Sequence, residues 1–226
     1  MATIITVANQ KGGPGKTTTA INVACGLQDA GYRVVVVDVD PQATLSKWNK
    51  KRIHGGFTKL IVHAVSQGLI DDTLTELRVS PDVDVVVVDC PGNIQDLTTR
   101  AVELSDAVLC PVRATAFDFE ATKDLARFVS TVRVQHPEII FMLFINAKHT
   151  SRGLDKGARE NLARVFEKHP NTKVLNTEIP DAAAVAEFGG TGQSIYEYAP
   201  KAPATRLYKK LTKEVYQCLV ASPVSA

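Results

Sequence analysis

Asn9-Gln10-Lys11-Gly12-Gly13-Pro14-Gly15-Lys16-Thr17-Thr18 is the glycine-rich run that decides the predicted fold. It follows Ile4 to Ala8, a short apolar and β-branched run that predicts a buried strand. After it, apolar residues recur at helical spacing from Ala20 to Leu27, which predicts a helix ending near Gly31. The run therefore connects a strand to a helix N-terminus, which is the setting of a phosphate-binding loop.

Each residue type in this loop suits the binding of a nucleoside triphosphate. Glycines let backbone N–H groups turn toward phosphate oxygens, Lys16 would bridge the terminal phosphates, and the Thr17 hydroxyl would ligate Mg²⁺. Gln10 stands where the standard pattern has Gly, and Pro14 removes one N–H donor. The alternative is a plain glycine turn with incidental lysines. The predicted nucleotide-binding residues of the loop are Lys11, Gly12, Gly13, Pro14, Gly15, Lys16, Thr17 and Thr18.

Composition favours one α/β domain. The 226 residues are 45% hydrophobic and 22% charged, with no bias toward disorder. We expect a domain over 1–220 and a short tail over 221–226. The chain shows no apolar stretch of about 18 residues and no secretory signal pattern, so we expect a cytoplasmic protein. Cys25, Cys90, Cys110 and Cys218 are far apart, which favours reduced core cysteines over disulfides or a metal site.

Two valine runs end in carboxylates. Val34 to Val37 precedes Asp38 and Asp40, and Val85 to Val88 precedes Asp89. Continuous rather than alternating valines predict strands buried on both faces, as in a parallel sheet covered by helices. Further strands are predicted at 107–112 and 139–145, with a short edge strand at 173–175, and helical patterns lie between them. The predicted fold is a single-domain, doubly wound, mostly parallel α/β sheet with helices on both faces, which binds ligands at the carboxyl ends of its strands.

The strand-end aspartates fit phosphoryl transfer, which needs positioning and neutralisation of charge. Asp89 is predicted to hold Mg²⁺, and Asp38 to lie in the outer shell of the metal. Asp40 is predicted to polarise the attacking water, and it joins Lys11 and Lys16 as a catalytic candidate. The alternative is that these aspartates only cap the helices that follow them.

Lys11 is redundant within one active site, because Lys16 already serves the phosphates. It either reaches the phosphates of a facing subunit, as an arginine finger does, or is simply a solvated lysine.

Three motifs together resemble the deviant Walker ATPases, specifically the ParA-type partition proteins. They are the loop from Lys11 to Thr18, Asp38-Val39-Asp40-Pro41-Gln42, and Val88-Asp89-Cys90-Pro91. Ala43 to Trp48 and Phe117 to Ala121 look most like the short ParF-like branch, which lacks an N-terminal helix-turn-helix extension. The resemblance implies a P-loop fold with a deviant Walker A motif, ATP and Mg²⁺ as cofactors, and hydrolysis supported by Asp40.

The resemblance also implies partners. Lys11 would contact ATP across a nucleotide-sandwich homodimer, and the ATP-bound dimer would bind nonspecific DNA and associate with the nucleoid. A cargo-bound, ParB-like activator protein would stimulate hydrolysis. The cargo stays open between a plasmid, a chromosome, a chemotaxis cluster and another large assembly.

DNA contacts must come from local basic patches, because the net charge is only +2. Related partition proteins often carry arginines after the pair that matches Ile179-Pro180, where this chain has Asp181 followed by three alanines. We therefore expect DNA to contact Lys201, Arg206, Lys209 and Lys210, with Arg152 and Lys156 as second choices. Solvated helix faces are the alternative for both patches.

Adenine recognition is assigned to Asn146, which follows a predicted strand, with Pro180 stacking near it. Turn formation or helix capping explains Asn146 equally well.

Two other functions compete. A MinD-like membrane-cycling ATPase would use the amphipathic last helix, although no membrane contact is expected because the chain beyond Leu219 lacks bulky anchors. An ATP-dependent metabolic ligase on the same fold would need further catalytic groups, and no such constellation is evident.

Overall fold

The apolar runs of the sequence form the strands of one sheet in the computed structural model, which describes residues 1–93, 96–149 and 157–220. The strands are β1 (Thr3–Val7), β2 (Val34–Asp38), β3 (Ile61–Ala64), β4 (Val85–Asp89), β5 (Ala107–Val112), β6 (Ile140–Ile145) and β7 (Thr172–Val174). They pair in parallel in the order β3-β2-β4-β1-β5-β6-β7. The predicted doubly wound parallel sheet is confirmed.

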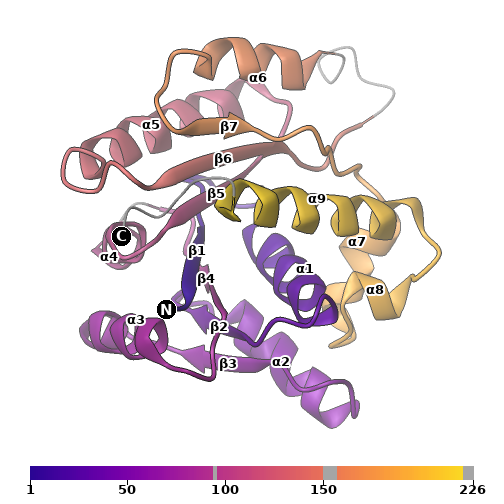
Figure 1. Ribbon diagram of the computed structural model, residues 1–226. Coiled ribbons are helices and arrows are strands. Elements are labelled where there is room, and N and C mark those ends of the chain that lie inside the picture. Colours follow the sequence, from indigo (N-terminus) through magenta and orange to yellow (C-terminus); the bar gives the residue numbers. More distant parts are fainter. Residues whose placement is uncertain (94–95, 150–156, 221–226) are drawn as a thin grey trace.

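Helices cover both faces of this sheet (Figure 1). They are α1 (Lys16–Asp29), α2 (Thr44–His54), α3 (Ile70–Val79), α4 (Asp96–Glu103), α5 (Ala116–Val132), α6 (Ala158–Phe166), α7 (Ala183–Glu187), α8 (Ile195–Tyr198) and α9 (Pro203–Val220), with single 3₁₀ turns at η1 (Gln67–Leu69) and η3 (Phe188–Gly190). Residues of α3, α4, α5 and α6 pack on one face. Residues of α1, α2, α8 and α9, with Phe188 of η3, pack on the other.

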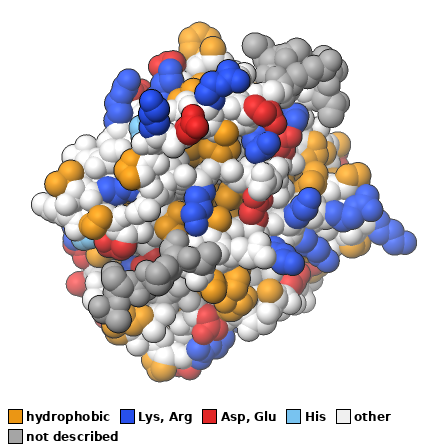
Figure 2. Space-filling view, turned by 45° about the horizontal axis from the view of Figure 1, so that its top comes forward, with side chains coloured by type: hydrophobic (Ala, Val, Ile, Leu, Met, Phe, Trp, Pro, Cys, Tyr) orange, Lys and Arg blue, Asp and Glu red, His pale blue; other side chains and the backbone are white. Residues whose placement is uncertain are grey.

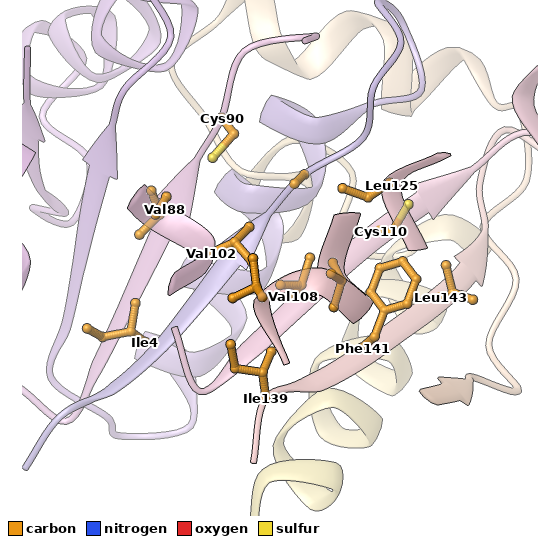
Figure 3. Packing of buried hydrophobic residues seen from close by; sticks show 14 of the residues in the cluster. Ile4, Val88, Cys90, Val102, Val108, Cys110, Leu125, Ile139, Phe141 and Leu143 are labelled. Atoms are coloured by element: carbon orange, nitrogen blue, oxygen red, sulfur yellow. The ribbon is translucent and has the colours of Figure 1, made fainter. Parts of the chain in front are cut away.

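The core lies on both sides of the central strands, because each strand sends alternate residues to opposite faces. Ile4 and Val88 belong to the cluster under α3 to α6, whereas Ile5 and Val87 belong to the cluster under α1, α2 and α9. Figure 3 shows Phe141 of β6 packed among Val108, Leu143 and neighbouring side chains of the first cluster. All four cysteines are free. Cys25, Cys90 and Cys110 are buried in these clusters, as the sequence predicts, whereas Cys218 is only half-buried at the edge of one of them.

One strand is missing from the sequence prediction. β3 lies at the edge of the sheet beside β2, and three of its four residues are exposed. The apolar stretch from Leu60 to Val65 is interrupted by His63 and is not followed by a carboxylate, so it lacks the continuous pattern that reveals β2 and β4. The predicted tail, 221–226, lies outside the described residues.

The register of the central strands brings the aspartates together. Asp38 at the end of β2 pairs with Asp89 at the end of β4, and Val7 at the end of β1 pairs with Asp89 from the other side. The loops after these three strands therefore meet at one edge of the sheet. In the described part of the chain, no helix is both long and apolar enough to cross a membrane.

We expect Phe141→Ala to lower the free energy of unfolding by about 3–5 kcal/mol, because it removes a buried ring and leaves a cavity. The matched control is Phe117→Ala, since Phe117 is 81% exposed and its loss is expected to change stability by about 0.5 kcal/mol or less. Urea denaturation measures both. Equal losses for the two variants would contradict the packing described here.

Candidate functional site

The loops after β1, β2 and β4 enclose a cleft of about 550 Å³. Its lining residues are Gly12, Gly13, Gly15, Lys16, Thr17, Thr18, Asp40, Pro41, Gln42, Pro91, Gly92 and Asn93. The cleft opens at the carboxyl edge of the parallel sheet and at the N-terminus of α1, where backbone N–H groups and the helix dipole favour an anion. The structure thus brings the predicted glycine loop together with Asp40.

Glycine is required at position 15. Its φ is +93°, a left-handed conformation that other residues adopt rarely. A Cβ there would also lie 2.4 Å from Nδ2 of Asn146. That amide nitrogen donates a 2.7 Å hydrogen bond to the carbonyl oxygen of Pro14. Asn146 therefore braces the glycine loop from the end of β6.

The proposed adenine residues do not line the cleft itself. The Oδ1 atom of Asn146 is buried and has no hydrogen-bond partner among the described residues. Pro180 lies beside Lys148 in a backbone bridge and lines a neighbouring hollow of about 370 Å³. Base binding by Asn146 and Pro180 stays a prediction.

Lys16 is nearly buried, with 7% of its surface exposed. Its Nζ donates a 2.9 Å hydrogen bond to the backbone carbonyl of Lys11, within the same loop. Burial lowers the pKa of this ammonium, while the negative charges of Asp89 and Asp40 act in the opposite direction. A phosphate entering the cleft would supply the counter-charge that this lysine otherwise lacks at close range.

Asp89 is fully buried at the end of β4, and neither of its carboxylate oxygens has a hydrogen-bond partner within the described residues. Burial raises the pKa of Asp89 to about 8. The Thr17 hydroxyl and the Lys16 ammonium lower this pKa, and Asp38 and Asp40 raise it further. An orphaned, buried carboxylate is costly, and a cation bound to it would remove that cost.

Asp38 already has partners. Its Oδ2 accepts hydrogen bonds from the backbone N–H of Ser46 at 2.9 Å and from the Ser46 hydroxyl at 2.6 Å, and its Oδ1 accepts from the backbone N–H of Asp40 at 3.2 Å. These contacts hold the first turn of α2, as the capping alternative for this aspartate predicts. A role of Asp38 in the outer shell of a metal stays a prediction.

Asp40 differs from Asp38, because its side chain faces the cleft. One carboxylate oxygen accepts from the backbone N–H of Gln42 at 2.9 Å, which shapes the loop before α2. The side chain lies among the lining residues of the cleft, where it is available to a water molecule beside the phosphates.

Thr17 and Asp89 fit the predicted Mg²⁺ site in chemistry, since both offer oxygen ligands. Among the described residues, no three His, Cys, Asp or Glu side chains form a group that holds a metal by itself. Mg²⁺ bound here would therefore also take phosphate oxygens and water as ligands, which is its usual arrangement in nucleotide sites.

Lys11 forms an ion pair that no pattern in the sequence predicts. Its Nζ lies 3.1 Å from Oδ2 of Asp118, at the start of α5. Asp118 is 2% exposed, whereas the Lys11 side chain is 42% exposed. The ammonium also lies 5.9 Å from the centre of the exposed Phe117 ring. Lys11 is thus neither freely solvated nor directed into its own cleft.

Two further residues that contact Lys11 belong to the site, although the sequence does not mark them as such. Asn9 is buried, donates to the carbonyl oxygen of Pro111 at 2.8 Å and accepts from the backbone N–H of Lys11 at 3.1 Å. Asp118 follows Thr115, the N-cap of α5, whose hydroxyl accepts from the backbone N–H of Asp118 at 3.1 Å. The Thr-x-x-Asp spacing signals a helix start. No local pattern signals its pairing with a lysine 107 residues away.

The predicted DNA-binding residues divide into two sets. Lys201, Arg206, Lys209 and Lys210 lie in or just before α9, and all four are exposed. Arg152 and Lys156 lie outside the described residues. Lys209 has an acidic neighbour, Asp29 of α1, so part of the α9 charge is balanced within the chain.

Comparison with known proteins agrees with this geometry. A family model described as the CobQ/CobB/MinD/ParA nucleotide binding domain matches residues 5–195. The chain is 29% identical to the chromosome-partitioning ATPase Soj of Thermus thermophilus, over 93% of this chain and 94% of that protein. It is 30% identical to the sporulation initiation inhibitor protein Soj of Bacillus subtilis, over 95% of this chain and 98% of that protein.

The fold is also that of solved structures. The septum site-determining protein MinD of Pyrococcus horikoshii, in complex with Mg-ADP, superposes with a TM-score of 0.69 at 18% identity, over 100% of both chains.

In the absence of Mg²⁺ and nucleotide, we expect Asp89→Asn to raise the free energy of unfolding by roughly 1–3 kcal/mol at pH 8, because the substitution removes a buried charge. The wild-type folded chain keeps a proton on Asp89 up to about pH 8, whereas the unfolded chain releases it near pH 3.8. The folded state thus binds more protons in this window, so the contribution of Asp89 to stability falls as the pH rises from about 4 to about 8.

Thermal unfolding between pH 5 and pH 8.5 measures this effect. The advantage of Asp89→Asn over the wild type is expected to grow with pH, whereas Asp82→Asn, at an exposed position, is expected to leave the curve unchanged. Wild-type and Asp89→Asn curves that stay parallel over this range would contradict the buried titration of Asp89.

Proposed function

This chain belongs to the CobQ/CobB/MinD/ParA family of nucleotide-binding domains, and from this premise we propose that it is a Mg²⁺-dependent ATPase of the ParA type. It forms ATP-sandwich homodimers in the cytoplasm, binds nonspecific DNA in that state, and segregates or positions a cargo. A ParB-like activator on the cargo stimulates hydrolysis. The names of the two Soj relatives support a role in chromosome partitioning or sporulation control.

The observation that carries the proposal is the pairing of a glycine-loop cleft with a buried, unpartnered Asp89. The loop backbone and Lys16 bind and orient the phosphates, with the Nζ of Lys16 moving from the Lys11 carbonyl to a phosphate oxygen. Thr17 and Asp89 hold Mg²⁺, which neutralises charge on the phosphates when bound. Asp40 orients the attacking water from the cleft wall.

Lys11 supplies the dimer dependence. In a single chain its ammonium is held by Asp118, away from its own cleft. We infer that in the dimer it leaves Asp118 and contacts the nucleotide of the partner subunit, where it neutralises charge in trans. A cation supplied only by a second copy makes hydrolysis conditional on dimerisation.

DNA binding by α9 is supported by its exposed basic residues and by the position of its apolar ones. Tyr208, Leu211 and Val215 are buried in the core cluster, so the exposed surface of α9 is mainly basic, and within the described residues Val220 is its one exposed large apolar side chain. A helix that lies in a membrane interface needs both exposed cations and an exposed apolar face. This arrangement favours a nucleic-acid backbone over a MinD-like membrane contact.

The central experiment measures dimerisation and DNA binding in ATP, ADP or no nucleotide. We expect the wild type to dimerise and to bind duplex DNA only with ATP, and Lys11→Ala to lose both. Asp40→Ala is expected to keep ATP-dependent dimerisation but to hydrolyse ATP at least about a hundredfold more slowly, because the water is no longer oriented. A wild type that neither dimerises nor binds DNA in ATP would refute the proposed function. A monomeric Asp40→Ala variant would refute the role given to Asp40.

Asp118→Asn tests the competition for Lys11. The amide keeps the shape of the side chain but removes the charge that holds the ammonium. We expect this variant to dimerise at an ATP concentration roughly two- to fivefold lower than that required by the wild type. The expected effect is modest because the Lys11 side chain of this ion pair is half-exposed. Asp124→Asn, which breaks the exposed pair with Arg127 on the same helix, is the matched control. Analytical ultracentrifugation over an ATP series gives the measurement, and weaker dimerisation of Asp118→Asn would contradict the competition.

A further inference from the structure

The segment from residue 41 to residue 70 contains five Lys and Arg residues and no Asp or Glu. The whole chain has 24 acidic residues in 226, so a stretch of thirty would carry about three (24 × 30/226). This segment holds α2 and β3, at the edge of the sheet away from α5 and α6 (Figure 1). The segment has a net charge of +5, whereas α9 has four basic residues and Glu214, a net charge of +3. The proposed function does not use this charge.

The cations of α2 lie on one side of the helix. Lys47, Lys50 and Lys51 follow the i, i+3, i+4 spacing of a single helical face, and all three are exposed. We call these three lysines the α2 basic face. The opposite face carries Leu45 and Trp48, which are buried in the core.

Arg52 does not belong to the α2 basic face, because it is buried and its charge is neutralised by Glu197. It is 2% exposed, and its guanidinium forms hydrogen bonds of 2.7 and 2.9 Å with both carboxylate oxygens of Glu197 in α8. This pair fixes α2 against α8 and leaves the three lysines on the outer side.

The α2 basic face has no acidic partner. Within the described ranges, none of its lysines forms an ion pair. Lys47 donates to the carbonyl oxygen of Gln42 at 2.9 Å and Lys51 to that of Gly190 at 3.1 Å, so each ammonium keeps two further N–H donors. Helix α5 shows the opposite pattern, with Lys123 paired to Glu120 and Arg127 to Asp124.

Helix stability does not explain these lysines. Cations stabilise the last turn of a helix through its dipole, which accounts for Lys51. Lys47 lies in the first turn, where a cation is unfavourable, and like charges three and four residues apart repel one another. The α2 basic face thus carries an electrostatic cost that a bound polyanion would remove.

We propose that the α2 basic face is a docking surface for the phosphate backbone of duplex DNA, separate from the residues of α9. The three lysines span about 6 Å along the helix axis, which matches roughly two phosphates of one strand. Among the described residues of α2, Ile53 is the one exposed large apolar side chain, so the surface of this helix suits a sugar-phosphate backbone better than a lipid bilayer. Figure 2, turned so that the top of Figure 1 comes forward, shows a different face, on which basic and acidic side chains are mixed apart from several Lys and Arg side chains toward the right.

The surface is also connected to the nucleotide cleft. The first turn of α2 is hydrogen-bonded to Asp38 through the backbone and the hydroxyl of Ser46. Asp38 pairs in register with Asp89, so α2 begins directly beside the residues proposed to hold Mg²⁺. DNA bound on this face lies next to the site whose nucleotide state governs the proposed dimer.

The test is a salt series of DNA binding with ATP present, and it rests on the proposed function. The double variant Lys50→Gln/Lys51→Gln is expected to bind duplex DNA at least about tenfold more weakly at low salt, with a log–log salt slope smaller by about one per lysine and chain. The matched control is Lys123→Gln/Arg127→Gln on α5, which removes the same number of charges and is expected to keep the wild-type slope.

Three outcomes overturn the proposal. If the wild type binds DNA and the double variant keeps its affinity and slope, the α2 surface alone is refuted. If the wild type binds no DNA in ATP at any salt, the proposed function fails with it. If vesicles of phosphatidylserine and phosphatidylcholine bind the wild type and compete with DNA for the α2 lysines, the ligand is a membrane. The single variant Lys50→Gln gives a second salt slope, which does not depend on the hydrogen bond from Lys51 to the carbonyl oxygen of Gly190. Lys50 is exposed, and its side chain donates no hydrogen bond within the described residues.

Discussion

A fully buried carboxylate without a hydrogen-bond partner in the described structure, that of Asp89, is the constraint on which the site depends. It is placed by the parallel register of β1, β4 and β2, which also brings Asp38 beside it and the glycine loop above it. The packing of helices on both faces of the sheet holds these strand ends in place. The stability of the core therefore offsets the cost of burying the Asp89 carboxylate without a partner. A cation bound at Asp89 together with a nucleotide would remove this cost.

Much of this arrangement is predictable from sequence because it is local. The valine runs of β2 and β4 are continuous, so both their burial and the aspartates that end them are visible in the chain. The glycine loop is visible for the same reason. The exposed edge strand β3 has no such pattern, and its presence follows only from its pairing with β2.

The part of the site that sequence could not predict depends on distant contacts. Asn146 braces the loop at Pro14, and Asp118 holds Lys11, over separations of 132 and 107 residues. Neither contact leaves a periodic pattern. A lysine that looked redundant in the sequence has a partner in the fold, and this partner is part of the same chain.

Under the proposed function, the Lys11–Asp118 pair would also explain why the chain carries a second lysine in the glycine loop. A second lysine free to enter its own cleft would supply charge at all times, and hydrolysis would not require another copy of the protein. Because the buried carboxylate of Asp118 holds the Lys11 ammonium, this ammonium can bind in a nucleotide cleft only where a stronger anion compensates for the lost ion pair. In the proposed dimer, the triphosphate bound to the facing subunit would be such an anion, and its hydrolysis would restore the preference of Lys11 for Asp118. Under the proposed function, the same contact would therefore favour the separated chains before ATP binds and after it has been hydrolysed.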